Sequence, residues 1–291
     1  MHDELRYFVA IVEAGTYRRA AQRLHLTQPA LSAAITRLEA QMGARVLDRG
    51  RRGASMTAAG EALLPHAKAA LAAVEAGTRA VAEVEGLRDG EVRLAAGATA
   101  CTYLLPSILA QYREAHPGIR FLLREASTDE ARESLYAGDI DIAVITADEG
   151  EPWYTDELIL VRAPDFELQT RLERARFVTF GQRSTSRSLL DGLFPDADVV
   201  MELGSIAAVK GNVRACIGVA LVSRHAVERD LDQGQLVRIP HPKTPLRRPL
   251  ALVHMGVSRL PPAAAALREL LLSPQGRPKT LATRREATSR S

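Results

Sequence analysis

The segment from residue 16 to residue 39 constrains the fold most, because it holds two short helical patterns separated by only two residues. The first pattern covers residues 16–24 and the second covers residues 27–39, and each begins with a threonine, which suits a helix N-cap. Ala20 and Ala21 are small enough to let another helix cross closely, and Pro29 falls in a first helical turn, where no hydrogen-bonded N–H is lost. The spacing predicts two helices joined by a tight turn.

The second predicted helix has one apolar side. Leu31, Ile35, Leu38 and Met42 recur at the spacing of helical turns, so we expect them to pack inward. The residues left facing outward are Gln28, Ala30, Ser32, Ala33, Thr36 and Arg37. The second helix is therefore expected to be amphipathic.

The first turn of this helix carries candidate contacts to DNA bases, because a helix-turn-helix places the start of its second helix in the major groove. The candidates for base contact are Gln28, Pro29, Ala30 and Ser32. The Gln28 amide can pair with both N6 and N7 of an adenine. Arg18 and Arg37 are expected to contact phosphates, which position a protein without carrying sequence information.

A short basic hairpin, or wing, is predicted directly after this motif. Residues 46–57 contain two strand-like stretches around a tip in which Gly50 and Gly53 flank two arginines. The wing would lie beside the DNA backbone. The complete set of predicted DNA contacts is Arg18, Thr27, Gln28, Pro29, Ala30, Ser32, Thr36, Arg37, Arg49, Arg51 and Arg52. The alternative interpretation is a small helical bundle with an arginine-rich surface.

The distribution of charge favours DNA binding at one end of the chain. Residues 1–60 hold nine basic against five acidic residues, a net charge of +4, and residues 273–291 hold five basic residues against one acidic residue, again +4. Because the whole chain carries only +3, residues 61–272 carry about −5. A basic surface confined to one module is the footprint expected of a protein that meets phosphate there.

An ordered set of residues runs through the two helices and the wing: Phe8, Ala14-Gly15-Thr16, Ala20-Ala21, Leu24, Thr27-Gln28-Pro29-Ala30-Leu31-Ser32, Ile35, Leu38-Glu39, Gly43, Arg49 and Thr57-Ala58-Ala59-Gly60. This set resembles the N-terminal signature of LysR-type transcriptional regulators. The resemblance implies a sequence-specific DNA-binding regulator that is modulated by a small-molecule effector. It also implies partners of three kinds: double-stranded DNA, the effector, and further copies of the chain in dimers and tetramers.

A long helix is predicted to follow the wing. Two interleaved series of small or apolar residues recur every seven positions: Leu64, Leu71, Thr78 and Ala67, Val74, Val81. This pattern indicates a linker helix that can pair with a copy of itself, as in the family, although Pro65 removes one helical hydrogen bond. The alternative is a single amphipathic helix that lies on its own chain.

Beyond Gly90 the pattern alternates strands and helices, which is typical of a parallel α/β sheet. Strands are expected at residues 92–96, 119–124, 139–145, 176–180, 199–203, 219–222 and 249–254. Helices are expected at 102–115, after a capping box at 127–130, around 186–193, from 205, and at 261–272. The predicted fold class is therefore α/β, with an N-terminal winged helix-turn-helix, a long linker helix and a C-terminal two-lobed Rossmann-like effector domain similar to periplasmic binding proteins.

The predicted boundaries follow from these patterns. The winged helix-turn-helix covers residues 1–58, the linker and dimerisation helix covers 59–88, the effector-binding domain covers 89–272, and a disordered basic tail covers 273–291. Within the effector-binding domain, lobe I consists of residues 89–162 and 247–272, and lobe II consists of residues 163–246.

A cleft between the lobes is the predicted effector site, because open α/β sheets bind ligands beyond the C-terminal ends of their strands. The predicted effector contacts are Thr99, Ala100, Thr102, Thr128, Thr146, Gly204, Ser205 and Ile206. Several lie where a loop opens into a helix, and the free N–H groups of a helix N-terminus favour an anion, so we expect a small carboxylate or oxyanion. The alternative is that each serine or threonine is an ordinary helix cap.

The resemblance extends to the second half of the chain, through Gly138-Asp139, Asp141, Gly204-Ser205-Ile206, Val209-Lys210, Val213, Gly218-Val219-Ala220 and Ser223-Arg224. One position departs from the family, which usually has glycine where this chain has Cys216. Cys101 falls at a predicted helix start, where a thiolate would be stabilised, so a redox-sensing regulator that uses both cysteines is an alternative. Buried cysteines that act as small apolar residues are the other interpretation.

No pattern of an enzyme is present: the seven histidines are scattered, and no phosphate-binding loop, nucleophile elbow or zinc motif occurs. Asp139 and Asp141 could hold a metal, but a role in capping or turn hydrogen bonds is favoured, so neither metal nor cofactor is expected. The contrasting classes are an enzyme that uses the α/β cleft, which fold alone does not exclude, and a solute-binding protein. Neither class would explain the basic winged module.

The sequence contains no apolar run of about 18 residues and no secretory leader pattern, so no membrane contact is expected. Two cysteines make no disulfide framework. The predicted location is therefore the cytoplasm.

Overall fold

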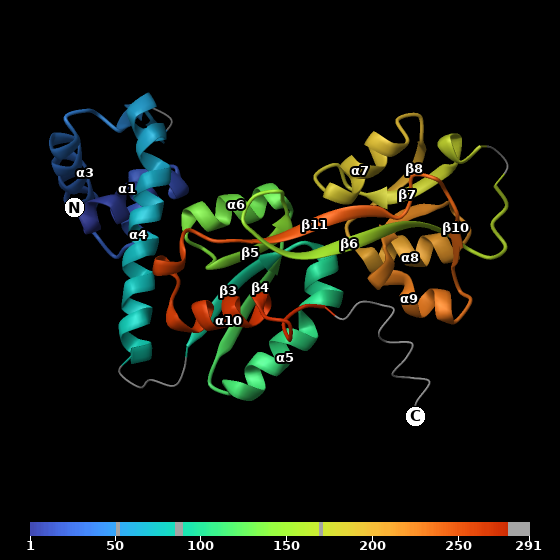
Figure 1. Cartoon of the computed structure of the whole chain (residues 1–291). Coiled ribbons are helices and arrows are strands. Elements are labelled where there is room, and N and C mark those ends of the chain that lie inside the picture. The colour runs from blue at the N-terminus through green and yellow to red at the C-terminus, as the bar shows by residue number, and fades with distance from the viewer. Residues whose placement is uncertain (51–52, 85–89, 169–170, 279–291) are drawn as a thin grey trace. The chain divides into compact units, whose positions relative to one another are not determined.

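The computed structural model of the chain describes residues 1–50, 53–84, 90–168 and 171–278 (Figure 1). The chain forms two compact units. One comprises Met1–Leu87 with Glu133–Asp139, and the other comprises Arg88–Arg132 with Ile140–Ser291.

The N-terminal unit is built from helices with one hairpin. Its elements are α1 (His2–Ala14), α2 (Tyr17–Arg23), α3 (Gln28–Met42), β1 (Leu47–Gly50), β2 (Gly53–Met56) and α4 (Ala58–Val84). Both predicted caps are confirmed: the Thr16 side chain accepts a hydrogen bond from the Arg19 N–H, and the Thr27 side chain accepts one from the Ala30 N–H. The turn between α2 and α3 places His25 at φ 53°, a left-handed conformation that reverses the chain tightly.

The core of this unit lies under α3. Leu31, Ile35 and Leu38 are fully buried against Phe8 of α1, as the apolar stripe predicts. Met42 is an exception, because it is 39% exposed and the prediction that it packs inward is wrong. It is the last residue of α3, directly before the C-cap Gly43, and the helix has by then passed the end of the core.

The long helix α4 (Ala58–Val84) continues through Pro65. Ala67 is buried in the core of the N-terminal unit, whereas Val74 and Val81 are 52% and 63% exposed. One side of α4 thus presents apolar residues to solvent in the single chain. The predicted end of the linker helix, at residue 88, lies outside the described residues.

The larger unit contains a seven-stranded sheet in the order β10-β6-β11-β5-β3-β4, with β9 paired to β6, and a two-stranded sheet β7-β8. Its strands are β3 (Glu91–Ala96), β4 (Arg120–Glu125), β5 (Ile142–Thr146), β6 (Glu151–Arg162), β7 (Arg176–Phe180), β8 (Asp198–Leu203), β9 (Ala220–Ser223), β10 (Val237–Ile239) and β11 (Leu246–Val253). Its helices are the π-helix η1 (Ala100–Leu104), α5 (Pro106–Ala115), the short 3-10 turns η2 (Leu172–Arg174) and η3 (Val257–Arg259), α7 (Thr185–Leu193), α8 (Ile206–Arg214), α9 (Arg224–Asp232) and α10 (Pro262–Leu272). The division between the units falls within α6 (Thr128–Ala137), which begins in the larger unit.

Two long strands connect the lobes of this unit. In lobe I, β3 runs parallel to β4 and β5, and β11 pairs antiparallel with β5. In lobe II, β7 runs parallel to β8, while β6 pairs antiparallel with β9 and β10. Because β6 also pairs antiparallel with β11, these two strands pass through both lobes, as Figure 1 shows. The parallel sheet expected from the sequence therefore holds for the centre of each lobe but not for the crossing strands.

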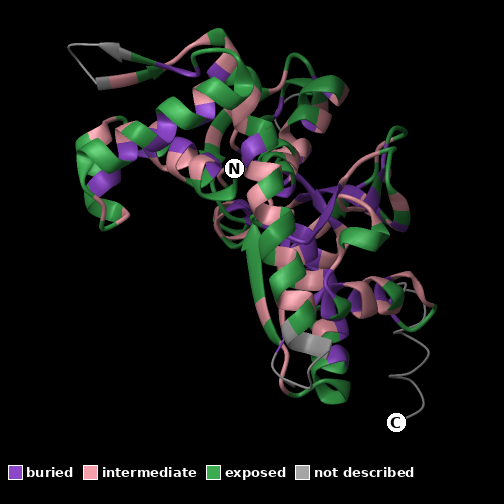
Figure 2. Cartoon of the chain, turned by 90° about the vertical axis from the view of Figure 1, so that its left-hand side faces the viewer, coloured by how far each residue is buried: buried purple, intermediate pink, exposed green. Residues whose placement is uncertain are grey.

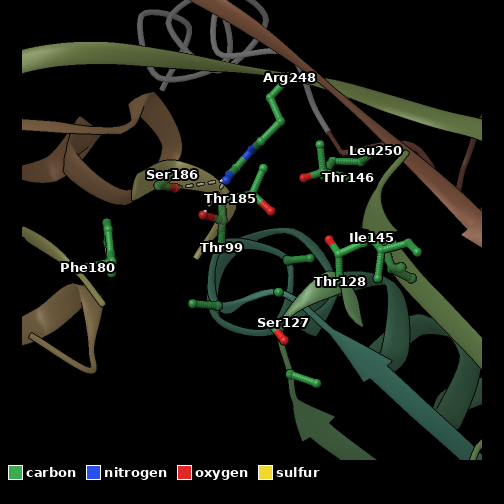
Figure 3. Close-up of a pocket in the computed structure, with 15 residues that line it drawn as sticks. Thr99, Ser127, Thr128, Ile145, Thr146, Phe180, Thr185, Ser186, Arg248 and Leu250 are labelled. Carbon is green, nitrogen blue, oxygen red and sulfur yellow. Dashed lines mark hydrogen bonds between the residues drawn. The ribbon is translucent and has the colours of Figure 1, made fainter. Parts of the chain in front are cut away.

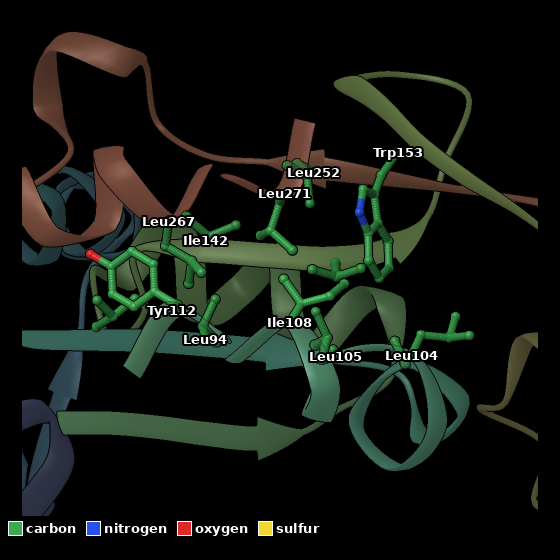
Figure 4. Packing of buried hydrophobic residues seen from close by; sticks show 14 of the residues in the cluster. Leu94, Leu104, Leu105, Ile108, Tyr112, Ile142, Trp153, Leu252, Leu267 and Leu271 are labelled. Atoms are coloured by element: carbon green, nitrogen blue, oxygen red, sulfur yellow. The ribbon is translucent and has the colours of Figure 1, made fainter. Parts of the chain in front are cut away.

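Helices cover the sheet of lobe I and form its core. Leu94 of β3, Ile108 of α5 and Leu267 of α10 pack together with Trp153 of β6 (Figure 4). Buried residues concentrate in the inner strands β3 and β5, whereas the edge strand β4 is exposed, and Figure 2 shows that the helices alternate buried and exposed positions. This alternation is the pattern of amphipathic helices that pack on a sheet.

The single helix expected over residues 102–115 is wrong. The chain first makes one π-helical turn, η1, in which the Leu105 N–H donates to the Ala100 carbonyl, and α5 begins only at Pro106. Proline has no N–H to donate and suits a first helical turn, so Pro106 marks the start of α5.

The chain after α10 is tied to lobe I for a few residues. The Trp153 Nε1–H donates to the Gly276 carbonyl at 3.0 Å, and the Ser273 hydroxyl donates to the Leu270 carbonyl at 2.7 Å. The expectation of a disordered tail from Ser273 onward is therefore wrong for residues 273–278. Residues 279–291 lie outside the described part of the chain.

Candidate DNA-binding surface and effector pocket

The start of α3 forms an exposed polar surface. Leu31 anchors the helix in the core, while Gln28, Pro29 and Ala30 are all exposed in the first turn. The Thr27 cap fixes the backbone of this turn, because its side-chain oxygen lies 3.3 Å from the Ala30 nitrogen. The side chains predicted to meet bases are thus held on a rigid helix end and point away from the core.

The other predicted contacts on the helices differ in how free their side chains are. Arg18 is exposed on α2. Arg37 is exposed as well, but its Nε donates to Glu4 at 3.2 Å. The N-terminal amino group and Arg37 together lower the pKa of Glu4 to about 2, so this carboxylate stays charged beside the arginine. The Thr36 hydroxyl donates to the carbonyl of the partly buried Ser32 within its own helix.

The wing is joined to α3 by hydrogen bonds. Glu39 Oε1 accepts from the Val46 N–H at 3.0 Å and from the Leu47 N–H at 3.3 Å, which orients the start of β1. The strands pair antiparallel from Leu47 opposite Met56 to Gly50 opposite Gly53. Arg49 lies on β1, whereas the predicted contacts Arg51 and Arg52 lie outside the described residues.

A pocket of about 80 Å³ lies between the two lobes of the larger unit (Figure 3). It is lined by Gly97, Ala98, Thr99, Ala100, Ala126, Ser127, Thr128, Val144, Ile145, Thr146, Phe180, Thr185, Ser186, Arg248 and Leu250. The lining comes from the ends of β3, β4 and β5 in lobe I, from the start of α7 in lobe II, and from the crossing strand β11. Such a cleft at the C-terminal ends of parallel strands suits a small ligand.

Two helix N-termini open toward this pocket. Ser127 and Glu130 form the predicted capping box of α6, with the Glu130 carboxylate accepting from the Ser127 N–H at 3.0 Å. Ser184 caps α7 by accepting from the Ser186 N–H at 3.2 Å. Within the described part of the chain, the hydroxyls of Thr128 and Thr185 have no hydrogen-bond partner. They are available to a ligand near positive helix ends.

Arg248 is the one charged residue among those lining the pocket. Its Nη2 donates to Asp156 Oδ2 at 2.6 Å and to Thr99 Oγ1 at 3.0 Å, and its Nη1 donates to Ser186 Oγ at 3.0 Å. Asp156 is fully buried, and its other oxygen accepts from the Ser223 hydroxyl at 2.7 Å. The guanidinium therefore touches both lobes and both crossing strands.

The structure brings together four of the eight predicted effector contacts: Thr99, Ala100, Thr128 and Thr146. The other four do not line the pocket. Thr102 is exposed on η1, Ser205 caps α8 by accepting from the Ala208 N–H, and Ile206 is buried in the core of lobe II. Gly204 directly precedes this cap and is exposed.

The wall of lobe II is formed instead by Phe180, Thr185 and Ser186. Phe180 ends β7, and Thr185 and Ser186 open α7, so these residues stand at a strand end like the residues predicted in lobe I. The capping signal at Ser184 could have indicated them. Arg248 gave no such signal, because the sequence does not show which of two consecutive arginines on a strand faces inward.

Both parts of the chain match models of one protein family. Residues 2–61 match "Bacterial regulatory helix-turn-helix protein, lysR family", and residues 85–274 match "LysR substrate binding domain". The chain belongs to the LysR family of transcriptional regulators. It is therefore a DNA-binding transcriptional regulator with an effector-binding domain, and its relatives are regulators rather than enzymes.

Relatives support this membership, and solved structures share the fold. The chain is 31% identical over 275 residues to a "Probable RuBisCO transcriptional regulator" of a Nostoc species, covering 86% of this chain and 81% of that protein. It is 34% identical over 253 residues to a protein of the same description from Cyanidioschyzon merolae, covering 79% and 84% of the two chains. ArgP from Mycobacterium tuberculosis has a similar fold, with a TM-score of 0.70 at 20% identity over 95% of this chain and 98% of that one. Full-length LysG from Corynebacterium glutamicum, solved with bound effector Arg, has a TM-score of 0.63 at 18% identity over 92% and 97%.

The cysteines of this LysR-type regulator do not form a poised thiol pair. Burial, together with the charge of Glu125, raises the pKa of Cys101 to about 11, and its thiol donates to the Ala96 carbonyl. The prediction that a helix start stabilises a Cys101 thiolate is therefore wrong. Cys216 is exposed and adopts φ 60°, the left-handed conformation in which the family usually has glycine.

One of the two aspartates considered as metal ligands, Asp141, has a structural role. Asp141 Oδ2 accepts from the Arg93 N–H at 2.9 Å, which ties the start of β5 to β3 and confirms the hydrogen-bonding interpretation. Among the described residues, no group of three or more potential ligands could hold a metal ion. None of the helices in that part of the chain has the length and apolar character needed to cross a bilayer.

Proposed function

We propose that this regulator contacts operator bases through the first turn of α3 and that a small anion in the pocket between its lobes changes how it binds DNA. The observation that carries the first part is the exposed turn Gln28 to Ala30, capped by Thr27 and backed by buried Leu31. A glutamine amide in this position can make two hydrogen bonds to an adenine edge. Arg18, Arg37 and the wing would contact phosphates on either side.

The observation that carries the second part is the composition of the pocket. Its lining combines hydroxyl groups, two helix N-termini and one buried arginine, and it includes no acidic side chain among the described residues. Each of these groups favours negative charge. LysG, which has a similar fold, was solved with a small bound effector, Arg.

The proposal includes self-association through α4. Val74 and Val81 are exposed apolar residues seven positions apart, the spacing that lets two helices pair along one seam. A dimer would present two α3 helices to two half-sites, and a tetramer would present four. The effector would close or twist the two lobes, change how the subunits are arranged, and so alter the spacing or bend of the bound DNA.

Binding of the purified full-length protein to the DNA upstream of its own gene tests the first part. We expect saturable binding that weakens steeply between low and moderate salt, because phosphate contacts release counterions. Binding that is equally tight on unrelated DNA at every salt concentration would contradict a sequence-specific regulator. Sedimentation of the free protein, and of an α4 variant with Val74→Glu and Val81→Glu, tests self-association in the same preparation.

A further inference from the structure

The guanidinium of Arg248 has one N–H group without an acceptor among the described residues. Its side chain leaves β11 and points toward Thr99, Thr185 and Ser186 at the pocket (Figure 3). The residue is only 7% exposed. The described residues accept from both of its terminal nitrogens, but its buried Nε–H has no hydrogen-bond partner among them.

A buried N–H without an acceptor is costly, and native proteins rarely retain one without a reason. Asp156 already has one donor on each carboxylate oxygen, from Ser223 and from Arg248 itself. The described residues thus leave Nε without an acceptor, and Arg248 lines the pocket.

We propose that Arg248 is the anion-binding residue of the pocket and that Asp156 is its internal counter-ion, against which a bound anion competes. This inference rests on the proposed effector function and specifies the chemistry of its ligand. A carboxylate or a tetrahedral oxyanion supplies two charged acceptors to a guanidinium, and such charge-assisted bonds are stronger than those to the uncharged oxygens of a neutral ligand.

The pocket also limits the size of the ligand. Its volume of about 80 Å³ suits a small ligand. The ligand class is thus a short carboxylate or an inorganic oxyanion, with Thr128, Thr146 and Thr185 as further hydrogen-bond donors.

The position of Arg248 connects binding to the lobes. Thr99 belongs to lobe I, Ser186 begins α7 in lobe II, and Asp156 lies on a crossing strand. An anion that attracts the guanidinium weakens its bonds to these three acceptors together. A change in the hydrogen-bond partners of Arg248 thereby changes contacts in both lobes.

Substitutions of the two members of the ion pair should change the affinity for an anion in opposite directions. Arg248→Gln removes the positive charge and should weaken binding by about tenfold or more. Asp156→Asn removes the competing negative charge but keeps the shape of the side chain, so it should tighten binding by about tenfold. A residue that only stabilises the fold would not produce a gain of affinity.

The test is isothermal titration of the full-length protein with sulfate, phosphate, acetate and malonate, at constant ionic strength set with sodium chloride. Arg247→Gln is the matched control, because Arg247 is the exposed neighbour on the same strand and does not line the pocket. Since Arg248→Gln leaves Asp156 buried without its partner, the double variant Arg248→Gln/Asp156→Asn provides a second, charge-balanced test.

We expect at least one of these anions to bind the wild type and Arg247→Gln equally, to bind Asp156→Asn more tightly, and to bind both Arg248 variants weakly or not at all. Which anion binds distinguishes a carboxylate from an inorganic oxyanion. The proposal is overturned if none binds the wild type, if Arg248→Gln binds as well as the wild type, or if Asp156→Asn weakens binding. If anion binding depends on Arg248 but leaves the DNA complex unchanged, the assignment of Arg248 stands and the proposed regulation fails.

Discussion

Gly60 at the start of α4 packs directly against the carbonyl oxygen of Val46, so that a Cβ on Gly60 would lie 2.1 Å from that oxygen. Because both partners of this contact are main chain, no side-chain rotation can relieve it. Gly60→Ala should therefore displace the wing from α4 and destabilise the N-terminal unit by about 1–3 kcal/mol. Gly77→Ala is the control in the same helix, because its Cβ would meet nothing within 4 Å. It should stabilise the helix by about 1 kcal/mol, and equal effects of the two substitutions in urea unfolding would refute this account.

The hydrogen bonds from Val46 and Leu47 to Glu39 join the start of β1 to α3. Glu39→Ala leaves two partly buried N–H groups without an acceptor, which should cost about 1–3 kcal/mol of stability and weaken DNA binding. Glu39→Gln keeps one side-chain acceptor and should lose less of both. Urea unfolding and DNA titration measure the two effects, and an Ala variant as stable as the Gln variant would show that these bonds matter little.

Gln28 and Arg18 should affect DNA binding in different ways. Gln28→Ala should relax base preference at one position of the half-site, at a cost of about 1–3 kcal/mol on the preferred sequence. Arg18→Ala should weaken binding to all sequences alike and reduce the slope of log affinity against log salt by about 1. Affinities measured on a set of single-base operator variants at several salt concentrations separate the two roles. Identical specificity profiles for the two variants would contradict this division.

Cys216 occupies a backbone conformation, φ 60°, that suits glycine. The left-handed region costs a residue with a Cβ roughly 1–2 kcal/mol. Glycine avoids this cost, but it also raises the conformational entropy of the unfolded chain, which offsets part of the stabilisation. Cys216→Gly should therefore stabilise the larger unit by about 0.5–1 kcal/mol. Cys216→Ala removes the sulfur but keeps the Cβ, and it should give no such gain. A larger increase in Tm for alanine than for glycine would show that the backbone conformation is not the cause.

Cys101 should be slow to react with alkylating reagents. Burial and Glu125 raise its pKa to about 11, so the thiolate is scarce at neutral pH and forms as the pH rises through that value. At pH 8, iodoacetamide should modify the exposed Cys216 first, and unfolding in urea should make both cysteines react. Mass spectrometry of the tryptic peptides gives the two rates. Modification of Cys101 as fast as an exposed thiol would revive the redox alternative.

The sequence was most informative where a feature depends on local chemistry. The caps at Thr16 and Thr27, the capping box at Ser127 and the cap at Ser205 all follow from side-chain oxygens that bond to N–H groups two or three residues ahead. The buried stripe of α3 follows in the same way from helical periodicity.

Features that depend on distant parts of the chain were not predicted. The sequence does not predict the twelve-residue strand β6, because Asp156 and Glu157 interrupt its apolar pattern. Only the fold shows that Asp156 pairs with an arginine from β11. The sequence predicts the pocket wall of lobe II after β8, whereas the wall lies after β7. Each of these strands is followed by a capped helix, so the sequence pattern does not distinguish them. Which of the two ends faces the other lobe depends on the crossing strands.

The central claim is that an anion held between the lobes changes the complex with DNA, and DNase footprinting on the DNA upstream of the gene tests it most directly. The wild type would be footprinted alone and with each of the anions sulfate, phosphate, acetate and malonate. The account predicts a protected dyad whose length or internal hypersensitive sites change with at least one anion, and no such change in Arg248→Gln. A footprint that is the same with every anion, or that changes equally in Arg248→Gln, would contradict it.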